Sequence, residues 1–165
     1  MARNRGDGPV TLSIVDRLID EDPRTSQEVP LTRAQSLRAF KSAVRRDLEW
    51  LLNTRHPVVP PPEESEVEKS LYMYGLPDIT SMSASNIRDR QRLIRSIEET
   101  LELFEPRIAN PKVTMTSPGD EKVPALRFVI EGMLRVDPSP EHVTFDTFLE
   151  LSSGEYKVQG DAGAR

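Results

Sequence analysis

Residues 97–116 read IEETLELFEPRIANPKVTMT, and the spacing of the apolar residues changes within this stretch. Up to Phe104 the apolar residues recur every three or four positions, which is typical of one buried face of a helix. Pro106 ends that pattern, because proline lacks the N–H that a helix needs. Beyond Pro111 apolar and polar residues alternate, which is typical of a strand. The stretch therefore predicts a helical first half of the chain and a sheet in the second.

Three helices are predicted before this change of period. A short amphipathic helix in residues 11–21 ends at an Asp-Pro pair. A longer helix is capped by Thr32 and ends near Arg55, and a third begins at Ser83 or Ser85 and ends at Pro106. The expected buried faces of the two long helices are Leu37, Phe40, Val44, Leu48, Leu51 and Leu52, and then Ile87, Leu93, Ile94, Ile97, Leu101 and Phe104.

Charged residues lie opposite both buried faces. On the second helix they are Arg38, Lys41, Arg45, Arg46 and Glu49, which form either a solvated face or a contact patch for an acidic partner. On the third helix bases come first and acids last, which opposes the helix dipole at a cost of about 0.3–1 kcal/mol for each misplaced charge. Tertiary or partner contacts are expected to offset that cost.

Consecutive hairpins are predicted beyond the change of period. The strands are residues 112–116, a longer one with a bulge at Gly132, one beginning at Val143 whose buried face extends to Leu151, and residues 156–158. Because helices precede strands, the fold class is α+β, with the N-terminal helices on one face of a C-terminal antiparallel or mixed sheet. We expect one domain over 11–158, flexible tails at 1–10 and 159–165, and a stiff Pro/Glu-rich linker at 56–69.

Composition excludes several classes of function. The net charge of −5 disfavours nucleic acid as a partner. The chain has no cysteine, and its two histidines, His56 and His142, lack metal-site spacing, so no metal or other cofactor is expected. No signal peptide and no apolar run long enough to cross a bilayer are visible, which favours a cytoplasmic protein that is not itself embedded in a membrane.

Catalytic motifs are also missing. There is no glycine-rich phosphate loop and no serine in a nucleophile-elbow context. Glu105 in its apolar surroundings could pair with another acid for glycoside hydrolysis. Arg107 two residues away would keep it ionised, which suits an ion pair better than a proton donor. We expect no enzyme activity.

Five stretches, in an unbroken order, resemble one family. Residues 97–108, with Glu105-Pro106-Arg107, resemble the phage gene-25 type baseplate wedge proteins. Residues 16–24 and 37–55, Tyr74-Gly75-Leu76-Pro77-Asp78, and residues 128–132 with 145–147 are similar to the TssE version found in bacterial type VI secretion systems.

The resemblance implies a gene-25-like wedge subunit of a contractile injection machine. It would join wedge subunits of the TssF, TssG and TssK type in a cytoplasmic baseplate docked at the inner membrane. It would also provide a platform for a contractile sheath of TssB and TssC type subunits. Partner binding would use Phe104, Glu105, Pro106 and Arg107 together with Tyr74, Gly75, Leu76, Pro77 and Asp78.

Two of the predicted binding surfaces each allow a second interpretation without a partner. Tyr156, Lys157 and Val158 are the predicted sheath-facing edge strand, or else an ordinary edge without a partner. Glu105 and Arg107 either form an internal pair that ends the helix or are buried against a partner. We expect replacement of either by alanine to spare the isolated fold but abolish assembly.

Two rival functions remain open for the chain. One is a lysozyme-like peptidoglycan hydrolase, a label sometimes attached to the family, and the other is a regulatory module that binds a protease adaptor through the same fold.

Overall fold

The structure is a computed structural model that describes residues 8–18, 31–57, 66–79, 82–83, 86–116 and 125–161. The predicted linker lies partly outside these ranges, as do most of the predicted tails, the cap candidate Ser85 and the loop after Thr116. Of the predicted first helix, α1 is observed over Ile14–Leu18. Within the predicted linker, residues Glu66–Lys69 form the 3-10 helix η1, which is followed by η2 over Leu71–Met73.

Helix α2 spans Arg33–Asn53 and begins as predicted. The Thr32 side chain accepts a hydrogen bond from the backbone N–H of Gln35, and the Gln35 side chain accepts one from the backbone N–H of Thr32. This capping box satisfies N–H groups that have no partner within the helix. The predicted apolar face is confirmed, because its residues are buried except for the half-buried Leu37.

Helix α3 spans Ile87–Phe104, and its cap differs from the prediction. The Asn86 side chain, rather than Ser83 or Ser85, accepts the hydrogen bond from Arg88 N–H. Asparagine is as good a cap as serine, so the sequence offered several equivalent starts. The helix ends immediately before Glu105, as Pro106 predicted.

The second half of the chain forms one antiparallel sheet in the order β1-β2-β3-β4. Its strands are β1 over Ile108–Thr116, β2 over Ala125–Leu134, β3 over Glu141–Glu150 and β4 over Tyr156–Asp161. Thus β1 begins earlier than predicted and β4 ends later, and Leu151, expected on the buried face of a strand, is exposed in a turn. The α+β prediction is confirmed.

Opposite Gly132, β1 carries the irregularity that the sequence had placed in β2. Its register shifts between Ala109 and Lys112, where Asn110 has a positive φ of 51°. A Cβ on Gly132 would lie 2.4 Å from a methyl carbon of Ile108. The glycine therefore makes room for a bulge in its neighbour, and the bulge lets β1 run through Pro111.

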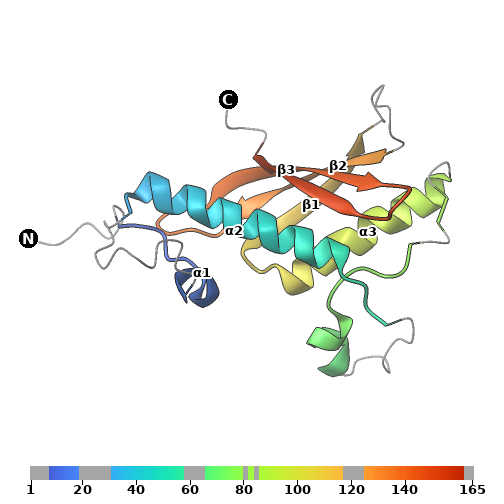
Figure 1. Ribbon diagram of the computed structural model, residues 1–165, viewed down its shortest axis with the longest axis horizontal. Helices are drawn as coiled ribbons and strands as arrows, with labels where there is room; N and C mark the ends of the chain where they lie inside the picture. Colours follow the sequence, from blue (N-terminus) through green and yellow to red (C-terminus); the bar gives the residue numbers. More distant parts are fainter. Residues whose placement is uncertain are drawn as a thin grey trace, which may run out of the picture.

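Both long helices cover the same face of the sheet, as Figure 1 shows. Helix α2 packs along β4 and α3 packs along β1, so each edge strand has a helix beside it. The core lies between the layers and includes Leu48, Leu52, Ile97, Leu101, Phe128, Phe145 and Tyr156. The other sheet face carries alternate, more exposed residues such as Arg127, Glu131 and Lys157.

Candidate functional site

The end of α3 carries an ion pair between Glu105 and Arg107. Nε and one terminal nitrogen of Arg107 donate to the two carboxylate oxygens of Glu105, and each donor–acceptor distance is 2.5 Å. Glu105 is only 3% exposed, while Pro106 between them is exposed. A two-pronged bond of this kind fixes the orientation of both side chains. Of the two predicted alternatives, the internal pair is the one that forms in the isolated chain.

Arg107 is also bound to helix α2. It donates over 2.8 Å to Asp47, and Asp47 accepts in turn from Arg46. Burial acts to lower the pKa of Arg107, but the bonds to Glu105 and Asp47 and their negative charges outweigh it, so the pKa lies above the ordinary arginine value. The charged groups therefore join α2 to the junction between α3 and β1.

The same network reaches α1. Arg46 donates over 2.7 Å to Asp16, and the Ser13 hydroxyl donates to the other oxygen of that carboxylate. The Ser13 bond, opposed by partial burial and aided by Arg46, holds the pKa of Asp16 below its ordinary value of 3.8. Because α1 contains no buried residue, these polar contacts are a main attachment of the helix to the domain.

Two segments predicted to bind partners meet at this network. The rings of Tyr74 and Phe104 pack edge to face with centroids 5.4 Å apart. Burial, followed by the negative charges of Asp47 and Glu105, raises the pKa of Tyr74. No sequence pattern indicated that these segments would be adjacent, because about thirty residues and a helix separate them.

Within the second segment, Gly75 and Leu76 hold the fold together. Leu76 is fully buried, and its N–H and C=O bond to Thr54 and His56 in a short parallel bridge. Gly75 has a φ of 108°, and a Cβ there would lie 2.4 Å from the carbonyl oxygen of Thr54. In the isolated subunit these two residues face inward, whereas Pro77 is half-buried and Asp78 is exposed.

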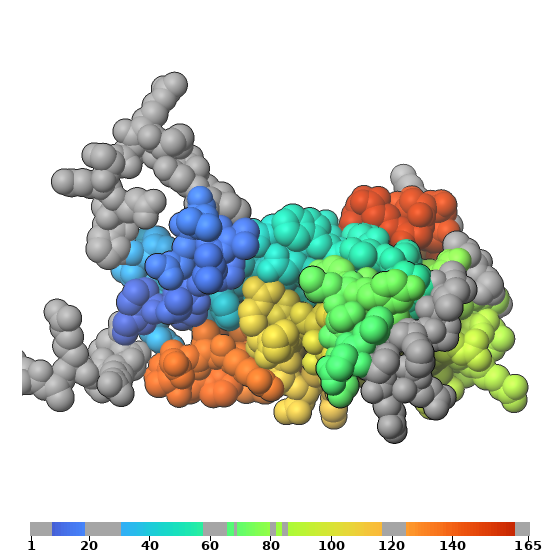
Figure 2. All heavy atoms as spheres, turned by 90° about the horizontal axis from the view of Figure 1, so that it is seen from below, coloured from blue at the N-terminus to red at the C-terminus, as the bar shows by residue number. Residues whose placement is uncertain are grey.

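Elements that carry exposed apolar side chains surround the network on one face of the molecule. In Figure 2, α1 in blue, α2 in cyan, the end of α3 in yellow and η1–η2 in green form a continuous surface. These elements carry the exposed apolar residues Ile14, Val15, Leu18, Trp50, Leu71, Tyr72 and Leu103. We call this surface, with Glu105, Pro106, Arg107 and Asp47 in it, the junction face. Exposed apolar groups around a partly buried ion pair are typical of protein interfaces.

The predicted sheath-facing edge, β4, is bonded to α2. Asn53 donates to the carbonyl of Tyr156 and accepts from its N–H, both over 2.8 Å. Glu49 accepts from the N–H of Val158, and Arg45 donates to its carbonyl. The expectation of unpaired backbone groups at Tyr156 and Val158 is therefore wrong, as is that of a purely solvated face for Arg45 and Glu49. Helical periodicity identified the outer face of α2 but not the strand beside it.

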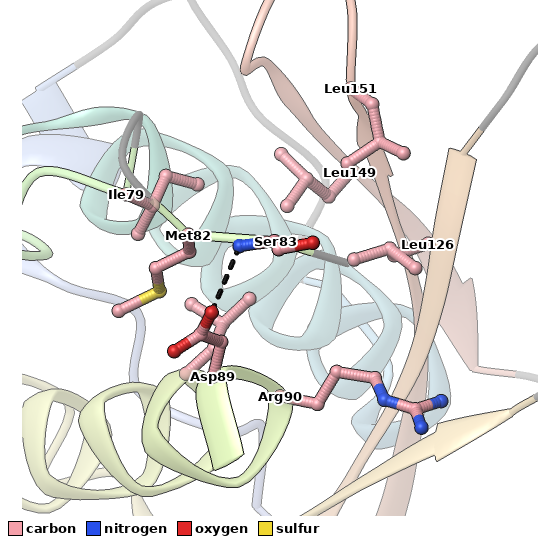
Figure 3. Close-up of a pocket in the computed structure, with 9 residues that line it drawn as sticks. Ile79, Met82, Ser83, Asp89, Arg90, Leu126, Leu149 and Leu151 are labelled. Carbon is pink, nitrogen blue, oxygen red and sulfur yellow. Dashed lines mark hydrogen bonds between the residues drawn. The ribbon is translucent and has the colours of Figure 1, made fainter. Parts of the chain in front are cut away.

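A small hollow at the far end of the sheet, shown in Figure 3, is mostly apolar. Leu126, Leu149 and Leu151 line it from the sheet side, and Ile79 and Met82 from the loop before α3. Among the described residues, Asp89 is the one carboxylate that lines this hollow, and it accepts a hydrogen bond from Ser83 N–H. Within the described ranges no group of His, Cys, Asp or Glu side chains could hold a metal ion.

Comparison with known families identifies the class of protein. The family described as baseplate wedge protein gp25 matches residues 38–139, from α2 to the end of β2 and the turn that follows. The chain belongs to the gp25 family of baseplate wedge proteins. The match includes the Glu105–Arg107 pair and Asp47, whereas α1 and the strands β3 and β4 lie outside it.

No curated protein and no solved structure gave a significant match. Among the helices that the structure describes, none has the length and apolar character needed to cross a membrane. The gp25 family establishes a baseplate structural component that contacts other baseplate subunits.

Proposed function

We propose that the chain is a non-catalytic wedge component of a type VI secretion baseplate, equivalent to a TssE subunit. It joins TssF, TssG and TssK type subunits and supports assembly of a TssB and TssC type sheath in the cytoplasm, at the inner membrane. Membership of the gp25 family supports the baseplate role. The type VI assignment rests on the resemblance of residues 16–24, 37–55 and 74–78 to TssE subunits.

The observation that carries the docking role is the junction face. Glu105, Arg107 and Asp47 form a pre-organised charged centre, and exposed apolar groups such as Trp50, 61% exposed, lie on the same face. A partner that covers this face would desolvate both the charges and the apolar rim. Because the charges are already oriented, little conformational entropy remains to be lost on binding.

Sheath support requires a free sheet edge, and β4 does not offer one while α2 is bonded to it. We propose that an incoming sheath strand displaces the side chains of Asn53, Glu49 and Arg45 and takes over the outward backbone groups of Tyr156 and Val158. The exchange replaces each hydrogen bond by another, so its net cost is small.

The geometry also changes the expected effect of alanine at the pair. Arg107→Ala would leave the buried Glu105 without its partner, so loss of assembly in that variant could reflect loss of stability. Replacing both side chains, as in Glu105→Leu/Arg107→Met, removes the pair but leaves no unpaired buried charge. Asp47 keeps its bond to Arg46 in that variant.

The test is co-purification of the chain with TssF and TssG type subunits. Wild type is expected to bind them, and Glu105→Leu/Arg107→Met is expected to melt near the wild-type temperature yet fail to bind. A folded double variant that assembles normally and supports secretion would contradict the docking role of the pair.

A separate assay addresses the lysozyme-like alternative. Both carboxylate oxygens of Glu105 accept hydrogen bonds from Arg107, so neither is free to hand a proton to a substrate. Purified chain is therefore expected to leave peptidoglycan intact. Turnover that Glu105→Gln abolishes would refute the proposal of a non-catalytic subunit.

A further inference from the structure

The outer face of α3 carries a stripe of five exposed charged residues. They follow one another at helical spacing, and their order is Arg88, Arg92, Arg95, Glu99 and Glu102. The stripe lies opposite the buried Leu93, Ile97 and Leu101, as a period of 3.6 residues requires. At about 1.5 Å per residue it is about 21 Å long.

None of these five side chains forms a hydrogen bond or ion pair with another described residue. Several arginines elsewhere in the described ranges bind a carboxylate or a backbone carbonyl, as Arg107 does with Asp47, Arg127 with Asp146 and Arg55 with Gly154. The tertiary contacts that could have offset the unfavourable charge order of α3 are therefore not made within the described part of the chain.

The arrangement of the stripe disfavours the isolated helix in two ways. Bases near the N-terminus and acids near the C-terminus oppose the helix dipole. The neighbours Arg88 and Arg92, Arg92 and Arg95, and Glu99 and Glu102 are like-charged at spacings of three or four. An order that mixed the signs would suit an isolated surface helix better, so segregation points to a requirement outside the subunit.

The position of the stripe indicates where a partner would enter. Its acidic end lies in the last turns of α3, directly before Glu105, and Leu103, which is 41% exposed, adjoins it. The arginines lie further away, toward the lime-coloured N-terminal end of α3 in Figure 2. A segment docked on the junction face and continuing along α3 would meet the acids first and then the bases.

We infer that this stripe is the binding site for a helix of a wedge partner with the complementary charge order. The partner helix carries bases near the junction face, opposite Glu99 and Glu102, and acids further along, opposite Arg88, Arg92 and Arg95. A straight row at helical spacing is matched best by another helix, which repeats its charges at the same intervals. The inference rests on the proposed function and adds the chemistry of the partner.

The acids in the stripe favour a protein over a nucleic acid as its occupant. A phosphate backbone is uniformly negative, so Glu99 and Glu102 would repel it over the half of the stripe that adjoins Glu105. A protein helix can match both signs, and that match specifies its direction along α3.

The experiment compares Arg88→Glu/Arg92→Glu with wild type for binding to purified TssF and TssG type subunits, measured at about 50 and about 500 mM NaCl. The control is Lys112→Glu/Arg135→Glu, which changes the net charge equally at exposed positions that belong to neither the stripe nor the junction face. A labelled DNA duplex is the second probe. Thermal melting is recorded for every variant.

The reversed variant is expected to bind at least tenfold more weakly at low salt, with a smaller loss at high salt, while the control binds as wild type does. Its melting temperature is expected to equal or exceed that of wild type, because glutamate at position 88 suits the helix dipole. Weakening without unfolding therefore locates the effect on the surface.

Two results would overturn the inference. Equal affinity of wild type and the reversed variant for the wedge subunits would exclude the stripe from the interface and leave the proposed function standing. Tight duplex binding by wild type that the reversal abolishes would assign the stripe to nucleic acid. If wild type binds no wedge subunit at all, the proposed function itself fails.

Discussion

Arg107 connects Glu105 to Asp47, and no local sequence pattern could reveal that connection. It bonds to Glu105, two residues away, and to Asp47 on α2, sixty residues away. Buried ion pairs contribute little net stability when intact but are costly when one partner is removed. Arg107 therefore has a structural role in the subunit as well as its proposed role in docking.

Arg107→Ala is expected to lower the free energy of unfolding by about 3 kcal/mol, because it leaves the carboxylate of Glu105 buried and unpaired. Chemical denaturation followed by circular dichroism measures the loss. The matched control, Glu105→Leu/Arg107→Met, is expected to fall within about 1 kcal/mol of wild type. Equal losses in both variants would show that packing, and not the unpaired charge, causes the effect.

Gly75→Ala is expected to destabilise the chain by about 2 kcal/mol or more, because the new Cβ would overlap the Thr54 carbonyl in addition to straining a positive φ. Gly154 is the matched control, since it also has a positive φ but has open space around its Cβ position. Its alanine variant is expected to lose only about 1 kcal/mol. Thermal melting of the two variants side by side tests the difference.

At the scale of elements, the sequence predicted most of what hydrophobic period alone determines. The buried face of α2, the stop at Pro106 and the antiparallel hairpins all follow from local patterns. The same holds for the buried face of α3 except at its first residue, since Ile87 was expected to be buried but is 63% exposed. The start of β1 was missed because Ile108 and Ala109 precede the bulge and the proline, which hide the alternation. The end of β4 was missed because Gln159, Gly160 and Asp161 carry no apolar residue.

The candidate site was predictable in part. The segments around Tyr74 and Glu105 could be selected by resemblance, but their adjacency, the link to Asp16 and the bonds from α2 to β4 are long-range contacts. A single polar residue such as Asn53 has the same local signature whether it faces water or a strand edge. Only the packing of the helix beside the strand decides between the two.

Asn53→Asp is expected to destabilise the domain more than Asn53→Ala. The aspartate still accepts from Tyr156 N–H but places a negative charge against the Tyr156 carbonyl, where the asparagine donates. We expect a loss of about 1–3 kcal/mol for alanine and more for aspartate. Hydrogen exchange at Tyr156 and Val158 should accelerate in both variants, and unchanged exchange would contradict the bonding of this edge by α2.

Across the whole molecule, a continuous series of charges joins α1, α2 and the junction between the helices and the sheet. Asp16, Arg46, Asp47, Arg107 and Glu105 alternate in sign along it. Arg46 also lies 5.1 Å from the ring centroid of Trp50, the sole tryptophan of the chain. Movement of α1 should therefore alter tryptophan fluorescence.

Acidification is expected to release α1. The pKa of Asp16 is lowered in the folded state, so its contribution to stability is complete above its ordinary value of 3.8 and is lost as the pH falls through the lower folded value. At pH 7 Asp16→Asn should cost roughly 0.5–1 kcal/mol, since the pair is partly exposed. Trp50 fluorescence and melting, compared between wild type and variant, should converge once the pH is below that folded value. A difference that persists there would contradict the assignment.

The bonds between α2 and β4 also affect how the subunit is made. The partner of Asn53, Tyr156, lies 103 residues later in the chain, and the partner of Glu49, Val158, lies 109 residues later. During synthesis α2 leaves the ribosome long before either partner exists, so its outer side chains remain in water until β4 has been translated. The closed edge of the sheet thus appears only after β4 has been translated, and β3 remains an open edge that could pair with a strand of another molecule until then.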